Sequence, residues 1–312
     1  MKQCFIDADK ESGNFSVYFI LPYYDNSVKE VQVACRTILN LADLETRVLS
    51  YIRLLYQLDR IQESGWTHCE ITPAAIFAEA SNPGVYHIGA FGRATKGECS
   101  TVNTEFTPPD HFIPPFIPED HVNAEELKQQ LQKKFDLFSL GMVFASMELE
   151  FEDWQALRHL YFDFAKSSFE KLSSPETSAA WKEVFGNAAA NASQKRFPPE
   201  NEETLPIMLL QAKLIQLIAH IATLDPSARF NTQFYLFQTH ELYNAVLSEK
   251  ENIKMRAEGK SEAELINHRL EDINEIKLRD LPNYELYYKD EIWLRRLKND
   301  LGIDVASKKI RV

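Results

Sequence analysis

Two side chains that can move a proton, His68 and Glu70, stand two residues apart within residues 64–77. An imidazole or a carboxylate held beside a substrate can act as a general base. Glu70 is therefore a candidate catalytic base, although a solvated carboxylate, or one bonded to its own loop, has the same sequence pattern. For His68 the alternative is a structural residue packed inside the fold.

The remaining histidines and the cysteines show no metal-binding pattern. Zinc sites place their ligands at short, fixed spacings, and this chain has no C-x-x-C, H-x-x-x-H or H-E-x-x-H spacing. We expect no metal and no other cofactor. The scattered cysteines are interpreted as reduced thiols of a cytoplasmic protein, with a disulfide as the alternative. They are Cys4, Cys35, Cys69 and Cys99.

The composition argues against several classes of protein. The 312 residues are 45% hydrophobic and 26% charged, which is typical of a globular domain. A formal net charge of −12 argues against nonspecific nucleic-acid binding and against an anionic lipid partner. The N-terminus lacks the apolar core of a secretory signal. No apolar run approaches the roughly 20 residues of a membrane span. We expect a soluble protein.

Mainly helical elements would hold residues 64–77 in place. An amphipathic helix from Asp43 to Gly65 precedes them, with an apolar stripe at helical spacing. Two short strands follow, around residues 76–77 and 85–88, with a turn between them. The other expected elements are strands 4–7 and 15–24, which form a hairpin, and helices 125–132, 135–147, 153–172, 179–185 and 205–224.

Residues 68–76, HCEITPAAI, resemble the catalytic loop of protein kinases, whose pattern is H-R-D-L-K-P-x-N-I. Residues 90–92, AFG, fall at the D-F-G position, and residues 108–110, PPD, at the A-P-E position. Residues 135–141, FDLFSLG, resemble the D-x-W-S-x-G helix, and residues 225–229, DPSAR, resemble the D-P-x-x-R segment. The five matches occur in the family's order. The resemblance therefore implies a protein-kinase-like C-lobe.

The resemblance also implies that the residues for phosphoryl transfer are missing. That reaction needs metal ions, held by oxygen ligands, and a positioned nucleophile. Ala75 stands at the metal-binding asparagine, Ala90 at the D-F-G aspartate and Thr72 at the lysine that steadies the phosphate. Glu70 alone keeps a carboxylate, at the catalytic-base position. The degenerate positions are His68, Glu70, Thr72, Ala75, Ala90, Phe91 and Gly92.

Three further residues are implied to hold the fold rather than to react. Asp136 lies in an apolar helix, where an unpaired charge would be costly. By resemblance it accepts backbone N–H bonds from the catalytic loop. Arg229 and Asp110 resemble the ion pair that anchors the activation segment.

Little of an N-lobe precedes the loop. Residues 21–24 fall at the kinase hinge, and upstream there is no Gly-rich loop, no β3 lysine and no room for a full helix C. We therefore expect a mainly α (α+β) fold in three parts. These are remnant N-lobe strands and hinge (1–30), a kinase-like C-lobe (31–247) and a helical C-terminal extension (248–312).

Together these features indicate a pseudokinase, a catalytically inactive domain that binds another protein as a scaffold or as a subunit of a larger assembly. Nucleotide binding is not expected. One alternative is a kinase-fold transferase that uses Glu70. Another is one half of a split kinase, in which Ala75 and Ala90 would still leave the metal site empty.

The C-terminal extension supplies the candidate contacts for a protein partner. Residues 261–264, SEAE, form a capping box, and residues 265–276 carry apolar side chains at helical spacing. A second helical stretch follows Pro282 and stops at Gly302. The apolar stripes pack either on the C-lobe or on a partner, where aromatic side chains dominate the binding energy. The candidate partner-binding residues are Tyr284, Tyr287, Trp293 and Leu297.

Overall fold

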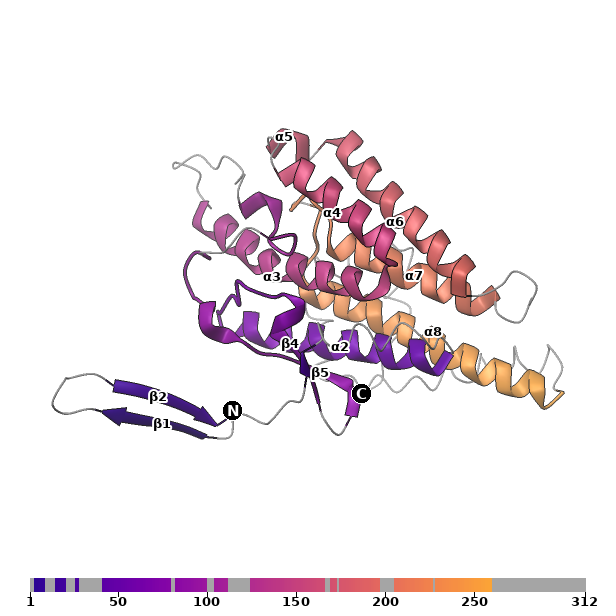
Figure 1. Cartoon of the computed structure of the whole chain (residues 1–312), viewed down its shortest axis with the longest axis horizontal. Coiled ribbons are helices and arrows are strands. Elements are labelled where there is room, and N and C mark those ends of the chain that lie inside the picture. The colour runs from indigo at the N-terminus through magenta and orange to yellow at the C-terminus, as the bar shows by residue number, and fades with distance from the viewer. Residues whose placement is uncertain are drawn as a thin grey trace, which may run out of the picture.

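The structure is a computed structural model, shown in Figure 1. It describes residues 3–8, 15–20, 26–27, 41–79, 82–99, 104–111, 124–165, 169–172, 174–196, 205–226 and 228–259. The described part is mainly helical with two small sheets, as predicted. None of the described helices is long and apolar enough to cross a membrane.

Helix α2, Leu41–Glu63, leads directly into the candidate loop. Most of its predicted apolar stripe is buried, with Val48, Leu55 and Leu58 wholly inside and Leu49 and Ile61 half-buried. Burying an aliphatic side chain of this size stabilises the fold by about 1.5–3 kcal/mol. The helix ends before Gly65, whose φ of +75° is a conformation that favours glycine. The predicted helix and its stop are both confirmed.

The N-terminal hairpin is also confirmed. Strand β1, Gln3–Ala8, pairs antiparallel with β2, Phe15–Ile20, in a register that sets Cys4 opposite Phe19. Figure 1 shows this hairpin at the edge of the molecule, away from the helices.

A second antiparallel sheet follows the candidate loop, with the strand order β3–β4–β5. Its strands are β3, Asn26–Ser27, β4, Ile76–Glu79, and β5, Asn82–Ile88. Strand β5 begins three residues earlier than predicted, because Asn82 already pairs with Glu79.

Helix α3, Ala124–Glu148, is continuous, although the sequence predicted two helices at 125–132 and 135–147. Its second half is almost wholly apolar and lies in the core, as its pattern predicted. The wholly buried apolar side chains of this half include Leu137, Phe138, Leu140, Met142, Val143 and Phe144.

Gly141 sets how closely α3 approaches α7, Leu205–Ile221. A Cβ atom at Gly141 would lie 2.7 Å from Cγ2 of Ile221 and 2.9 Å from the backbone nitrogen of Ala222. Real Cβ atoms do not come so close to other heavy atoms. Close packing of α3 on α7 therefore requires a glycine at position 141, the last position of the D-x-x-x-x-G pattern.

Three further helices follow α3 in the chain, and the last of them packs on α7. Where the sequence predicted one helix at 153–172, the structure describes α4, Phe151–Ala165, and α5, Phe169–Leu172. Helix α6, Pro175–Arg196, is much longer than the predicted 179–185. Its alanine-rich end lacks the large apolar residues that would have marked it in the sequence, yet alanine has the highest helix propensity.

Helix α8, Thr232–Ala257, was not predicted over its first half. The Asn231 side chain caps it by accepting a hydrogen bond from the Phe234 backbone nitrogen at 2.8 Å. The helix runs without a break past residue 248, so the predicted boundary between C-lobe and extension lies inside it. Beyond that boundary Glu249, Asn252 and Met255 are still buried.

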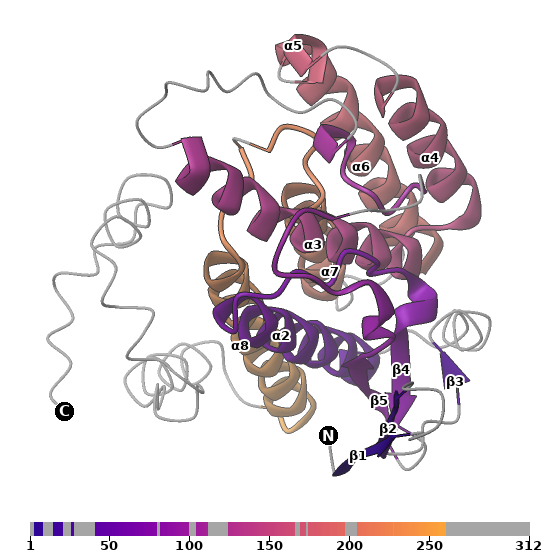
Figure 2. The same ribbon diagram turned by 90° about the vertical axis from the view of Figure 1, so that its left-hand side faces the viewer.

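Helices α2 and α8 lie side by side and antiparallel (Figure 2). At one end the Thr232 hydroxyl donates to Oε1 of Gln62 at 2.7 Å. At the other end Lys250 Nζ lies 2.8 Å from Oε2 of Glu45. The start of α8 therefore lies beside the candidate loop, and its end lies beside the start of α2.

Candidate functional site

The loop between α2 and β4 is held by two backbone hydrogen bonds to Asp136 of α3. Oδ2 of Asp136 accepts the backbone N–H of His68 at 2.5 Å, and Oδ1 accepts that of Cys69 at 2.9 Å. The φ of Cys69 is +65°, a left-handed conformation that lets two successive N–H groups meet one carboxylate. The resemblance implied this contact for Asp136.

Asp136 is wholly buried, and no cation is among the partners that hold it. Burial raises the pKa of Asp136 to about 7, although its two backbone hydrogen bonds lower it. The carboxylate is thus held by the loop's own backbone dipoles, and its role is structural.

Both ring nitrogens of His68 are engaged with the backbone. The Glu70 backbone N–H donates to Nδ1 at 3.3 Å, so the proton of the neutral ring sits on Nε2, which donates to the carbonyl of Gly89 at 2.6 Å. Burial lowers the pKa of His68 and favours this neutral form. The ring also packs against Phe91, with 4.8 Å between centroids. His68 is buried and holds the AFG segment, so it has no free nitrogen to act as a base.

Glu70 faces solvent. Its Oε2 lies 3.2 Å from Nε of Arg93, and about two fifths of each side chain is exposed. Arg93 follows Gly92, so the candidate base is paired with a cation from the AFG segment. An exposed pair of this kind contributes about 0–1 kcal/mol.

The other degenerate positions offer no metal ligands. Ala75 is buried in the short 3₁₀ helix Pro73–Ala75, which follows Thr72. Ala90 is exposed and has a φ of +58°. Methyl groups cannot coordinate a metal ion, and within the described ranges no three His, Cys, Asp or Glu side chains form a group able to hold one.

Arg229 and Asp110 form a buried ion pair. Nη2 of Arg229 lies 2.5 Å from Oδ1 of Asp110 and also donates to the carbonyl of Leu224 at 2.9 Å. Nε donates to the carbonyl of Thr223 at 2.7 Å, and the guanidinium lies 4.8 Å from the ring centroid of Phe138. The pair attaches Pro109–His111 to the helical core, which is the role that the resemblance implied.

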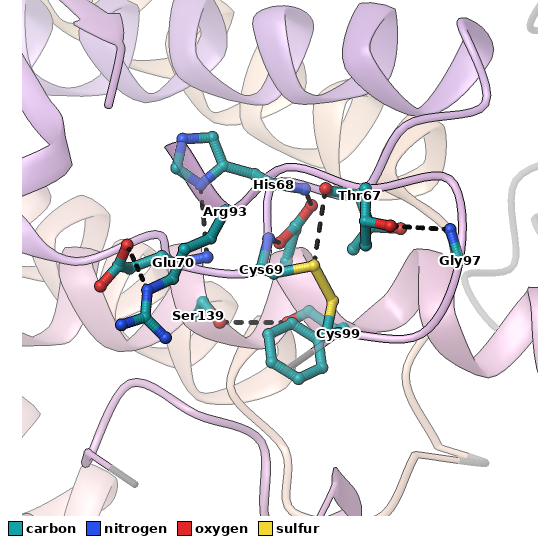
Figure 3. The surroundings of a disulfide bond; sticks show 11 residues. Thr67, His68, Cys69, Glu70, Arg93, Gly97, Cys99 and Ser139 are labelled. Carbon is teal, nitrogen blue, oxygen red and sulfur yellow. Dashed lines mark hydrogen bonds and ion pairs between the residues drawn. A yellow bond between two sulfur atoms is a disulfide. The ribbon is translucent and has the colours of Figure 1, made fainter. Parts of the chain in front are cut away.

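Cys69 and Cys99 are joined by a disulfide (Figure 3). The prediction of reduced thiols is wrong for these two residues. They are 30 positions apart in sequence, but the backbone pairing of Thr67 with Thr95 brings their Cα atoms to 5.4 Å, within disulfide range. Sequence spacing alone carries no signal of that pairing.

Next to the disulfide lies a small cavity of about 30 Å³, close to the volume of one water molecule. Cys69, Glu70, Thr72 and Ser139 are among its lining residues. This cavity is far too small for a nucleotide.

A buried polar cluster was missed by the sequence analysis. Glu148, at the end of α3, accepts hydrogen bonds from the Tyr51 hydroxyl at 2.5 Å and from Nε2 of Gln211 at 2.9 Å, and it pairs with Arg47. The cluster ties α2, α3 and α7 together. A glutamate near the end of an apolar helix carries no sequence signal of three partners, of which the nearest is 63 residues away.

Several predicted site residues lie outside the described residues. They are the hinge at 21–24 and the partner-binding candidates Tyr284, Tyr287, Trp293 and Leu297.

No protein-family model matches the chain. No curated protein matches it either. Among solved structures, the chain is similar to the crystal structure of the LegK7 effector kinase of Legionella pneumophila, with a TM-score of 0.45 and 13% sequence identity. The match covers 80% of this chain and 52% of that one, so this chain spans about half the length of that kinase chain. A match at this level bears on neither activity nor ligand.

Proposed function

We propose that this chain is a catalytically inactive, kinase-like domain that serves as a protein-binding scaffold or as a structural subunit of an assembly. One observation carries the proposal. The positions that would bind metal carry methyl groups, with Ala75 buried and Ala90 exposed, whereas Asp136 still holds the loop. A fold that keeps its supports without its metal ligands is suited to binding and not to phosphoryl transfer.

The two remaining groups with acid–base chemistry support the same conclusion. His68 has both ring nitrogens in backbone hydrogen bonds, and Glu70 is paired with Arg93. Losing one electrostatic stabiliser of a transition state typically costs about 10²–10³ in rate. Here the metal ligands and the phosphate-steadying lysine are absent together, at Ala75, Ala90 and Thr72.

The alternative is a kinase-fold transferase that uses Glu70. One observation favours it, since the Glu70 carboxylate is exposed and accessible to a substrate. In that case Arg93 would have to release Glu70, or would itself bind an anionic substrate group.

The test is phosphotransfer and nucleotide binding by the full chain. Incubated with ATP and Mg²⁺ or Mn²⁺, the protein should incorporate no phosphate, by intact mass, and its melting temperature should not move. A ligand at 100 times its Kd would stabilise the fold by about 2.7 kcal/mol, a shift that is easily seen. Autophosphorylation that disappears in Glu70→Gln would overturn the proposal in favour of the transferase.

A matched variant sharpens the test. Ala90→Asp restores a carboxylate at the D-F-G position, and aspartate tolerates the positive φ there better than alanine does. The side chain is exposed, so the variant should fold like the native chain. If Ala90→Asp alone confers a Mg²⁺-ATP-dependent thermal shift, the nucleotide site is intact and only its metal ligand was lost.

The scaffold role is tested by deleting residues 260–312. Helix α8 ends at Ala257, and Gly259 has a φ of +77°, so this cut leaves the described helices whole. The proposal expects a truncated protein that stays folded and loses its co-purifying partner. A truncated protein that aggregates or melts early would instead assign these residues to the domain core.

A further inference from the structure

Residues 89–99 cross the candidate loop and are held to it at their start. His68 binds the carbonyl of Gly89, and Thr67 and Thr95 exchange two backbone hydrogen bonds of 2.8 and 2.9 Å. This start is well fixed, since Thr67 and His68 are buried and His68 is also tied to Asp136.

Beyond Thr95 the segment faces solvent, since residues 96–98 are exposed. Nζ of Lys96 lies 5.3 Å from the ring centroid of Trp66, which is itself 42% exposed. An exposed cation–π contact contributes little. Lys96, Gly97 and Glu98 offer no apolar side chain for packing, and the Gly97 backbone N–H donates to Oγ1 of Thr95 at 2.9 Å within the same segment.

The disulfide closes the far end of this stretch. Its Cys69 half is rigid, because the side chain is 2% exposed and the backbone N–H is bound to Asp136. Its Cys99 half is partly exposed and follows the solvent-facing residues 96–98. Figure 3 shows the sulfur–sulfur bond that joins Cys99 to Cys69 of the loop. A reductant can therefore approach the bond from the Cys99 side.

We propose that the Cys69–Cys99 disulfide is a redox latch, which fastens residues 96–99 over the loop when oxidised and frees them when reduced. A dithiol reductant supplies the electrons. One of its thiolates attacks Sγ of Cys99, the Cys69–Cys99 bond breaks, and Cys69 leaves as a thiolate that takes up a proton. The second thiolate of the reductant closes an internal disulfide and releases Cys99 as a thiol, so two electrons and two protons pass to the protein.

Opening the latch changes the surface beside Glu70. Cys69 lines the small cavity together with Glu70 and Thr72, and the disulfide covers its sulfur. With residues 96–99 released, the Cys69 thiol and this edge of the loop become accessible to solvent. The start of the segment stays in place, because the Thr67–Thr95 pairing does not depend on the disulfide.

Limited proteolysis of the full chain tests the latch through the tryptic cut after Lys96, which lies between the two cysteines and is distinguished by product mass from the cut after Arg93. In the oxidised protein this cut should be slow, and its two products should separate only on a reducing gel. Dithiothreitol should speed the cut by at least about tenfold, because local opening sets the rate. Cys99→Ser should be cut at the fast rate without reductant. The double variant Cys4→Ser/Cys35→Ser, which keeps the latch, should respond to reductant like the native chain.

Hydrogen exchange separates a latch from a staple of the whole domain. Reduction should speed exchange in residues 96–99 and leave the amides of Leu137–Val143 in α3 unchanged. Equal acceleration in α3 would overturn the latch and make the disulfide a global support. An unchanged cutting rate after Lys96 would overturn it too, as would complete alkylation of Cys69 and Cys99 in the untreated protein.

Discussion

His68 links two regions of this molecule, the buried helix that carries Asp136 and the segment that begins at Gly89. On one side its backbone N–H is bound by Asp136, a wholly buried carboxylate that belongs to the supporting framework. On the other side its ring holds Gly89, next to Ala90, where the resemblance to kinases expects a metal ligand. The Asp136 contact that the resemblance implies is present, whereas the position at which it expects a metal ligand carries a methyl group.

The difference teaches which residues the fold itself requires. Replacing Asp136 or Arg229 leaves buried partners unsatisfied, and that costs folding free energy whether or not the protein has an activity. The Ala90 side chain, by contrast, is exposed, so its identity contributes little to the folding free energy. Folding stability therefore depends on the first set of positions, whereas only catalysis would depend on the second.

The largest effect is expected from Arg229→Ala. Removing the guanidinium would leave the Asp110 carboxylate and two backbone carbonyls without their partner. Breaking a buried ion pair in this way costs about 3–5 kcal/mol of folding free energy. Chemical denaturation measures the loss. Arg93→Ala removes an exposed pair instead and serves as the control, expected within about 0.5 kcal/mol of the native chain. Equal losses in the two variants would break the comparison.

Asp136→Ala should come next. It leaves the backbone N–H groups of His68 and Cys69 without their acceptor, at about 1–3 kcal/mol for each buried donor. Hydrogen exchange at these two amides should speed up in parallel. A variant that melts like the native chain would show that the carboxylate does not support the loop.

The raised pKa of Asp136 gives a pH dependence of known sign. Its folded pKa of about 7 lies above the ordinary 3.8, so between these values the folded state binds more protons than the unfolded state. The contribution of Asp136 to stability is therefore fully present below pH 4 and is lost as the pH rises to about 7. Asp136→Asn removes the titration. The native chain should lose stability relative to this variant as pH rises from 4 to 7, and a constant difference would contradict the raised pKa.

Gly141→Ala tests the framework where no polar group is involved. The new Cβ would clash with Ile221 and with the backbone of Ala222, and overpacking of this kind costs about 1–3 kcal/mol. Gly186→Ala in α6 is the matched control, because nothing lies within 4 Å of its Cβ position. The control should be stabilised by about 0.5–1 kcal/mol through higher helix propensity. Both are read from denaturation midpoints.

The smallest effect on the free energy of unfolding is expected at Glu70, the candidate catalytic base. Glu70→Ala should change the free energy of unfolding by less than about 1 kcal/mol, since its ion pair with Arg93 is exposed. A loss as large as that of Asp136→Ala would mean that Glu70 belongs to the framework after all.

Local patterns predicted much of this fold. The stripe of α2 and its stop at Gly65, the hairpin, and the buried second half of α3 all follow from apolar spacing and turn residues. The resemblance to kinases implied the contact of Asp136 with the loop. Independently, a charge in an apolar helix indicated that Asp136 needs polar partners.

The rest depends on tertiary contacts that no local pattern encodes. The start of α8 was missed because its aromatic and polar residues form no clear stripe, and its burial comes from packing on α2. The disulfide was missed because Cys69 and Cys99 meet only through the pairing of Thr67 with Thr95. The cluster around Glu148 joins three helices and is visible only once they pack.

The antiparallel pairing of α2 and α8 acts as a spacer of known length. At 1.5 Å per residue, the 23 residues of α2 span about 35 Å between the candidate loop at one end and the end of α8 at the other. Gly259, the last described residue, therefore lies about one helix length away from Cys69. An event at the disulfide and one at the end of α8 therefore take place at opposite ends of this helix pair.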